Sequence, residues 1–291
     1  MLMIKGTIKT IDIEERLITV STRKRVLTLY IQRAMFNRYM TYLEPNHMMV
    51  ANTKIHHDTT KQNRMYTVKD IIKIVKPTPR RTIILYSHDT IINQTKHFVN
   101  SLKNTLFLDL EMSMHPYYKD PHFVQEIIQA GYVLVDSHGN IIEKYMAFIQ
   151  PTKHKKLTKR TLKFLDLTQD DIDKGIPYDT FYQHFKQLLK TYNPAIIVWG
   201  KNDALALKET ANVNDLPNIN DRSRFVNLLK LHKNVFKLKN DLGLLKANQL
   251  YGYPTDTQRH DALEDAEMTK RIFDGFKAYL NDSITIDKTL L

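Results

Sequence analysis

The chain has 291 residues, of which 42% are hydrophobic and 25% are charged, so it has enough apolar content for a globular core. It contains no cysteine, which excludes disulfides, thiolate zinc sites, iron–sulfur clusters and cysteine nucleophiles. The start lacks the apolar run of a signal peptide, and no stretch reaches the ~20 apolar residues that span a bilayer. We therefore expect a soluble, cytoplasmic protein.

The 43 lysines and arginines exceed the 31 aspartates and glutamates by 12 charges, and this excess is unevenly distributed. Residues 1–104 contain 18 basic and 7 acidic residues, whereas residues 105–291 contain 25 and 24. This asymmetry predicts two modules, one of which binds a polyanion. A basic surface that only keeps the protein soluble is the alternative for the charge alone.

Residues 1–78 are predicted to form a small all-β module. Stretches rich in Val, Ile, Leu and Thr predict strands, and one stretch of helical spacing predicts a helix: strands at 3–13, 16–22 and 25–32, a helix over 33–43, then strands at 47–55 and 64–75. The order of three strands, a helix and two strands resembles the OB-fold, a small barrel that often binds single-stranded nucleic acid.

Basic side chains of this module are candidates for contact with nucleic acid, because lysine and arginine neutralise phosphates. The candidates are Lys5, Lys9, Arg23, Lys24, Arg25 and Arg33. Tyr30, Tyr42 and Tyr66 have rings on which bases could stack, but each is better interpreted as a core residue of a small barrel.

The KPTPRR stretch at 76–81 predicts a linker, so residues 79–104 are expected to be a linker that contains a helix. From residue 105 to 280, apolar strands at 105–112, 122–136, 141–151 and 193–200 alternate with helical segments. This alternation predicts an α/β domain whose sheet is covered by helices. Residues 281–291 are expected to be a tail.

Asp109 and Glu111 end an otherwise apolar strand, TLFLDLEM. In a strand, residues two apart point to the same face, so the two carboxylates project together while Leu108 and Leu110 point the other way. Adjacent carboxylates repel each other unless a cation lies between them. The pair is therefore a candidate ligand set for a hard metal ion.

Asp203 follows the buried strand NPAIIVWG at the point where a helix is expected to begin. Taken alone, this position is best explained as a helix cap, because aspartate accepts hydrogen bonds from the first amides of a helix. The same strand-to-helix position lies at the edge of a sheet, where functional sites of α/β folds collect. Both interpretations remain open for Asp203.

The stretch HDALEDAEMT contains two further candidates, His260 and Asp265. Five residues apart, they cannot share one helical face, so His260 is expected on the loop and Asp265 one turn into the helix. Asp265 begins a stripe that continues through Thr269, Ile272 and Phe276, which predicts that it points into the core. The remaining acids are favoured by the helix dipole and are expected to face water: Asp261, Glu264 and Glu267.

With these residues in order, D-x-E, a later aspartate and H-x-x-x-x-D, the chain resembles the DEDDh 3′–5′ exonuclease family. That family includes ribonuclease T, the proofreading subunit of bacterial DNA polymerase III and Eri-1-like exonucleases. The resemblance covers roughly residues 104–280, and it excludes the N-terminal module. It implies a ribonuclease H-like fold, a mixed five-stranded sheet flanked by helices, preceded here by the OB-like barrel.

The resemblance also implies roles for the candidate residues. Asp109, Glu111, Asp203 and Asp265 would bind two divalent ions, Mg²⁺ or Mn²⁺, with Glu111 counted among the catalytic groups. His260 would be the general base, a role that suits a side chain titrating near neutrality. Two residues, Met112 and Ser113, would lie beside the terminal nucleotide.

We therefore expect a metal-dependent enzyme that removes nucleotides from the 3′ end of single-stranded DNA or RNA. The basic module would hold the strand, and the nearly neutral module would bind phosphate mainly through its metals. The alternative is an inactive nucleic-acid-binding protein on a nuclease fold. All five candidate positions are filled, which argues against that alternative.

Overall fold

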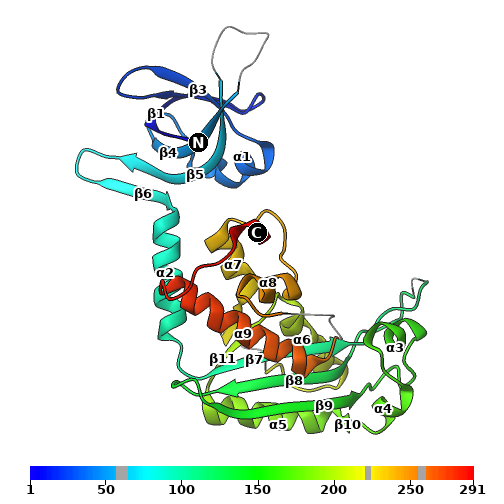
Figure 1. Ribbon diagram of the computed structural model, residues 1–291. Helices are drawn as coiled ribbons and strands as arrows, with labels where there is room; N and C mark the ends of the chain where they lie inside the picture. The colour runs from blue at the N-terminus through cyan, green and yellow to red at the C-terminus, as the bar shows by residue number, and fades with distance from the viewer. Residues whose placement is uncertain (57–64, 119, 220–223, 255–259) are drawn as a thin grey trace. The chain divides into compact units, whose positions relative to one another are not determined.

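The computed structural model describes residues 1–56, 65–118, 120–219, 224–254 and 260–291, and the chain divides into two compact units, Met1–Gln94 and Thr95–Leu291 (Figure 1). Helix α2 (His88–Ser101) carries the chain from the first unit into the second. In the described part of the chain, no helix combines the length and the apolar character needed to cross a bilayer.

The first unit is built on one sheet that closes on itself, with antiparallel pairings throughout except between β3 and β5. Its elements are β1 (Leu2–Asp12), β2 (Leu17–Ser21), β3 (Val26–Tyr30), α1 (Arg33–Tyr39), the 3₁₀ turn η1 (Met40–Tyr42), β4 (Met48–His56), β5 (Met65–Pro77) and β6 (Thr82–Ser87). The strand order is β3-β2-β1-β4-β5-β6, and a parallel pairing of β3 with β5 joins the ends of the first five strands into a barrel. The strands and the helix predicted in this module are confirmed.

Alternation along the strands places one apolar face inside this barrel. Ile8, Ile18 and Val20 are fully buried there, and Tyr66 is 1% exposed, so its interpretation as a core residue is confirmed. Tyr30 and Tyr42 are only half-buried. The stretch expected to begin a linker forms a hairpin turn instead, since β5 and β6 pair across residues 78–81.

The second unit contains one mixed sheet between helices. Its strands are β7 (Thr105–Met112), β8 (Ile127–Val135), β9 (Ile141–Gln150), β10 (Ile176–Pro177), β11 (Ala195–Val198) and β12 (Phe225–Asn227). Its helices are α3 (Lys159–Leu165), α4 (Gln169–Asp173), α5 (Tyr178–Tyr192), α6 (Asn202–Val213), α7 (Leu228–Phe236), α8 (Leu244–Leu250), α9 (Ala262–Leu280) and η3 (Lys288–Leu290).

The sheet order is β10-β9-β8-β7-β11-β12, with β7, β8 and β9 antiparallel and β11 parallel to both of its neighbours. The described sheet thus has six strands where five were expected. The two edge strands β10 and β12 have two and three residues, too few to leave a hydrophobic pattern in the sequence. Strand β8 is buried along its whole length, and α9 and α5 cover opposite faces of the sheet (Figure 1).

Strand β8 begins at Ile127, five residues later than expected. The preceding Glu126 is 1% exposed, and its carboxylate accepts hydrogen bonds from the backbone amides of Thr152, Lys153 and His154 at 2.7 to 3.3 Å. The Glu126 side chain therefore links the residue before β8 to the loop that follows β9.

Candidate active site

Asp109 and Glu111 leave the same face of β7 near its C-terminal end. Leu108 and Leu110, which alternate with them, belong to the apolar core on the other face, as the strand period requires. The acidic pair therefore faces away from that core, toward the side of the sheet on which α9 contacts β7 and β8.

Gly131 lets α9 start directly on the sheet. It is paired with Asp109 across the β7–β8 ladder, and a Cβ at this position would lie 2.2 Å from the carbonyl carbon of Ala262 and from the amide nitrogen of Leu263. Real side chains cannot make such contacts, so only glycine allows this approach. The close approach brings the first turn of α9, which contains Asp265, over the acidic end of β7.

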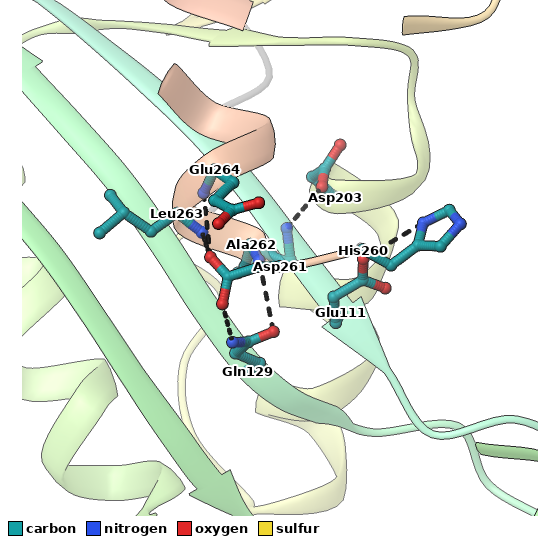
Figure 2. A network of polar contacts seen from close by, with 9 residues as sticks. Glu111, Gln129, Asp203, His260, Asp261, Ala262, Leu263 and Glu264 are labelled. Carbon is teal, nitrogen blue, oxygen red and sulfur yellow. Dashed lines mark hydrogen bonds and ion pairs between the residues drawn. The ribbon is translucent and has the colours of Figure 1, made fainter. Parts of the chain in front are cut away.

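The start of α9 is fixed by two polar side chains (Figure 2). Asp261 is the N-cap and accepts hydrogen bonds from the amides of Leu263 and Glu264, both at 3.0 Å. Gln129 of β8 donates to Asp261 at 2.9 Å and accepts from the amide of Ala262 at 3.3 Å. This role of Gln129 was not predicted from the sequence. Its position in an otherwise apolar strand could have indicated it, because a buried side-chain amide needs hydrogen-bond partners.

Asp265 is 4% exposed, and Thr269, Ile272 and Phe276 are fully buried, so the predicted inward stripe of α9 is confirmed. Glu264 is exposed, as expected. Glu267 is instead paired with Lys144 of β9 at 2.7 Å. Helical geometry thus separated the one inward acid of this stretch from the others.

Asp203 lies in the first turn of α6 and is 6% exposed. Its carboxylate does not cap the helix: the N-cap is Lys201, and no side chain bonds there. Instead Oδ1 of Asp203 accepts a hydrogen bond from the amide of Leu110 at 3.1 Å (Figure 2). The capping interpretation is therefore wrong, and Asp203 lies against the backbone between Asp109 and Glu111.

His260 stands on the loop immediately before the N-cap of α9, where its φ of 53° is in the left-handed region. Its ring stacks on Phe164 of α3, with centroids 4.5 Å apart and planes at 29°. Its Nδ1 is 3.8 Å from a carboxylate oxygen of Glu111 (Figure 2). Phe164 was also missed, because nothing near it in the sequence indicates a contact almost a hundred residues away.

The four acids share one poorly solvated space. Ligand atoms of Glu111, His260 and Asp265 lie within 4.8 Å of one another. Burial, followed by the charges of Asp203 and Asp265, raises the pKa of Asp109 well above its ordinary value. Burial and the charges of the same two aspartates raise the pKa of Glu111 to about 8.

The pKa of Asp203 is likewise raised by burial, to about 6, although hydrogen bonds from its own amide and from the Leu110 amide oppose the rise. Oxygen ligands of this kind fit a hard divalent cation, which would replace the lost solvation of each carboxylate and cancel the repulsion among them. The donor set therefore fits the metal site that the sequence predicts.

The two residues expected beside the terminal nucleotide have different environments. Met112 lines a cavity of about 280 Å³ together with residues of α6. Ser113 is 2% exposed; its amide donates to the Glu126 carbonyl, and its hydroxyl accepts from the Glu126 amide. Ser113 thus holds the backbone together and is not at the surface of the site.

The candidate nucleic-acid-binding residues of the barrel are all exposed. One groove of about 690 Å³ is lined by part of this set, namely Lys5, Arg23, Lys24 and Arg25. Lys9 and Arg33 are not among the residues that line it. The structure therefore divides the six candidates into a group of four and two separate side chains.

Comparison with known proteins is consistent with this site. An exonuclease family model matches residues 106–273, which include all five candidate residues. The probable 3′-5′ exonuclease KapD of Bacillus subtilis (strain 168) is 31% identical over 169 residues, 58% of this chain and 82% of that protein. The 3′-5′ exonuclease crn-4 of Caenorhabditis elegans is 25% identical over 62% of this chain and 66% of its own.

Solved structures give the same fold for the second unit. The nuclease domain of 3′hExo, a DEDDh family member bound to rAMP, matches with a TM-score of 0.54 and 20% identity over 65% of this chain and 98% of that domain. Cell-death related nuclease 4 matches with a TM-score of 0.51 and 22% identity over 64% of this chain and 67% of that chain.

The fold and the sequence matches define a hydrolase of phosphodiester bonds at 3′ ends. The chain belongs to the DEDDh 3′–5′ exonuclease family.

Proposed function

We propose that the chain hydrolyses single-stranded DNA or RNA from the 3′ end with two bound divalent ions, Mg²⁺ or Mn²⁺. Asp109, Glu111, Asp203 and Asp265 would hold them. The observation that carries this proposal is the convergence of acids from β7, α6 and α9, two with a pKa of about 6 and 8, on one buried space. The ions would supply charge stabilisation at phosphorus and a more acidic water.

The chain's own groups perform the remaining tasks. His260 takes the proton of the attacking water at a ring nitrogen, and its place on the loop before α9 leaves it 32% exposed and open to substrate. Phe164 holds the ring by stacking. Met112 borders the small cavity beside α6, where the terminal nucleotide is expected to contact the protein.

We further propose that the second unit has the ribonuclease H-like fold and that the barrel is an OB-like module that binds the single strand. Closure of the barrel through the parallel β3–β5 pairing and the helix between β3 and β4 support that assignment. The groove lined by Lys5, Arg23, Lys24 and Arg25 supports backbone binding through charge. Tyr66 is buried and cannot stack on bases.

The direct test offers 3′-labelled and 3′-blocked single- and double-stranded DNA and RNA to the wild type and to Asp109→Ala, with Mg²⁺ or Mn²⁺. We expect mononucleotides only from free 3′ ends of single strands, and none from the variant or in EDTA. Cleavage of blocked or circular strands would contradict the proposal. Binding without cleavage by the wild type would favour an inactive nucleic-acid-binding protein.

The barrel is tested with Lys5→Ala/Arg23→Ala/Lys24→Ala in the full chain. The salt slope is the change in log affinity with log salt concentration, and each lost phosphate contact lowers its magnitude by about 0.7 for a single strand. With three contacts removed, the magnitude of the slope should therefore fall by roughly 2. Hydrolysis of a mononucleotide ester should not change. An unaltered salt slope would remove the barrel from the binding surface.

A further inference from the structure

The near-neutral charge of the second unit conceals one strongly basic segment. Residues 151–165 contain six lysines and arginines and no acid. The six are all exposed: Lys153, Lys155, Lys156, Lys159, Arg160 and Lys163. Among the described residues, none of them has an ion-pair partner. We call these six residues the α3 basic surface.

Helical geometry joins this surface to the residue that touches the candidate base. On α3, Lys159 and Lys163 lie one turn apart, and Arg160 follows Lys159 by about 100°. Phe164 lies next to Arg160 on the same exposed side, while Thr161 faces the core. The basic side of α3 therefore ends at the ring that stacks on His260, 4.5 Å away.

A second set of contacts fixes α3 to the segment that leaves β7 just after Glu111. The hydroxyl of Thr158 donates to the carbonyl of Met114 at 3.0 Å, and the amide of Met114 donates to the hydroxyl of Thr161 at 2.9 Å. α3 is thus attached both to the end of the catalytic strand and to the loop that carries His260. The part of the α3 basic surface that lies on the helix, Lys159, Arg160 and Lys163, therefore has a defined place beside the candidate site.

Exposed aromatic rings occur in the same β7–β8 connection. Tyr117 and Tyr118 follow Met114 by three and four residues and are 77% and 72% exposed. Phe164 is 48% exposed. Basic side chains that neutralise phosphates, with open rings on which unpaired bases stack, are the combination that single-stranded nucleic acid requires.

We propose that the α3 basic surface binds the phosphodiester backbone of a single strand directly upstream of the nucleotide being removed. This proposal rests on the proposed 3′–5′ exonuclease function and adds the path of the strand. The second unit would then bind its substrate by its own surface charge and not mainly through metal ions, as the near-neutral net charge suggested. A duplex is excluded as the preferred ligand because its stacked bases cannot reach the rings.

The test reverses two charges in each of two matched places. Lys159→Glu/Lys163→Glu changes the α3 basic surface, and Lys186→Glu/Lys190→Glu changes an equally spaced, exposed pair on α5, on the other face of the sheet. Both pairs are made in the full chain, and again with Lys5→Ala/Arg23→Ala/Lys24→Ala so that the barrel contributes less. Lys159→Gln/Lys163→Gln is a milder version, and thermal melting verifies folding of each protein.

Binding of a long single-stranded oligothymidylate is measured in EDTA over a salt series. We expect the α3 pair of substitutions, Lys159→Glu/Lys163→Glu, to weaken binding roughly tenfold or more. It should also reduce the magnitude of the salt slope by about 1.4, because two phosphate contacts are lost. The α5 pair should change affinity less than about twofold, because its charge is distant from the strand. Equal losses from both pairs would overturn the proposal, since they would mean a general charge effect.

Hydrolysis separates this proposal from the proposed function. With Mg²⁺, the α3 pair should raise KM for the long strand and leave cleavage of the p-nitrophenyl ester of thymidine 5′-monophosphate unchanged. A wild type that binds but cleaves neither substrate would refute the exonuclease function, while the EDTA binding series would still decide the strand path. If the α3 pair lost affinity for polyglutamate but none for oligothymidylate, the surface would belong to an acidic protein partner.

Discussion

The two units place their charged residues differently. In the barrel, the candidate nucleic-acid-binding residues Lys5, Arg23 and Lys24 are exposed. In the second unit, acids of like charge are buried together, with Asp203 6% and Asp265 4% exposed. Exposed lysines interact weakly with one another and are held by nothing specific. Buried carboxylates destabilise each other and need positions defined by the fold. The barrel should therefore tolerate charge changes singly, and the acidic site should respond strongly to each one.

The largest effect is expected from Asp109→Asn, which tests the acidic half of this contrast. Loss of one ligand should reduce hydrolysis of 3′ ends by roughly a thousandfold or more. In EDTA the same variant should melt at a higher temperature than the wild type, because one of four mutually repelling, buried or half-buried acids has been neutralised. Lys24→Ala is the barrel control and should change neither property. A lower melting temperature for Asp109→Asn would disprove the repulsion.

Gly131→Ala should have the next largest effect. Its Cβ would collide with the backbone of Ala262 and Leu263, so α9 must move away from β8. Overpacking of this kind destabilises a protein by about 1–3 kcal/mol. A displacement near 1 Å lowers activity about a hundredfold.

Urea unfolding and single-turnover hydrolysis measure the two effects of Gly131→Ala. Gly243→Ala is the matched control, since a Cβ there meets nothing within 4 Å. If Gly131→Ala kept wild-type activity, α9 would not be positioned by this contact.

Phe164→Ala should lower kcat about tenfold by freeing the His260 ring, as expected for loss of a group that orients a general base. Phe164→Tyr keeps the stacking ring and should restore most of the rate. Phe98→Ala, which removes another exposed ring at 40% exposure, should have no effect. If Tyr rescued nothing, the ring would contribute by something other than stacking on His260.

The last prediction concerns the dependence of stability on pH. The ordinary pKa of Glu111 is 4.5 and its folded value is about 8, so the folded state binds the proton more tightly than the unfolded state. Stability is then highest at low pH in this range and falls as the pH rises from about 4.5 to about 8. Melting in EDTA at several pH values should show this decline, and Glu111→Gln should reduce it. A metal-free protein that became more stable over that range would contradict the predicted direction.

The periodicity of single helices and strands predicted the orientation of the candidate metal ligands, but not the contacts between elements that hold them in place. The inward position of Asp265 followed from the spacing of Thr269, Ile272 and Phe276, and the strand period placed Asp109 and Glu111 on one face. These inferences need only the geometry of one element.

What joins separate elements was invisible in the sequence. Gln129 ties β8 to the start of α9, Gly131 admits that start, and Phe164 reaches His260 from a different helix. No period links such residues, because each contact depends on how the chain folds back. Ser113, which the resemblance implies beside the terminal nucleotide, also makes such a contact, since its hydroxyl accepts a hydrogen bond from the Glu126 amide.

The bond between Asp203 and the Leu110 amide has a consequence for the sheet. β11 pairs with β7 only as far as Phe107, so beyond that point a carboxylate takes the place of a neighbouring strand's carbonyl. Asp203→Ala would leave a buried amide without an acceptor, at a cost of about 1–3 kcal/mol, whereas Asp203→Asn keeps an acceptor oxygen. A clean loss-of-function variant at this position is therefore asparagine, because alanine would also loosen the end of the strand that bears Asp109 and Glu111.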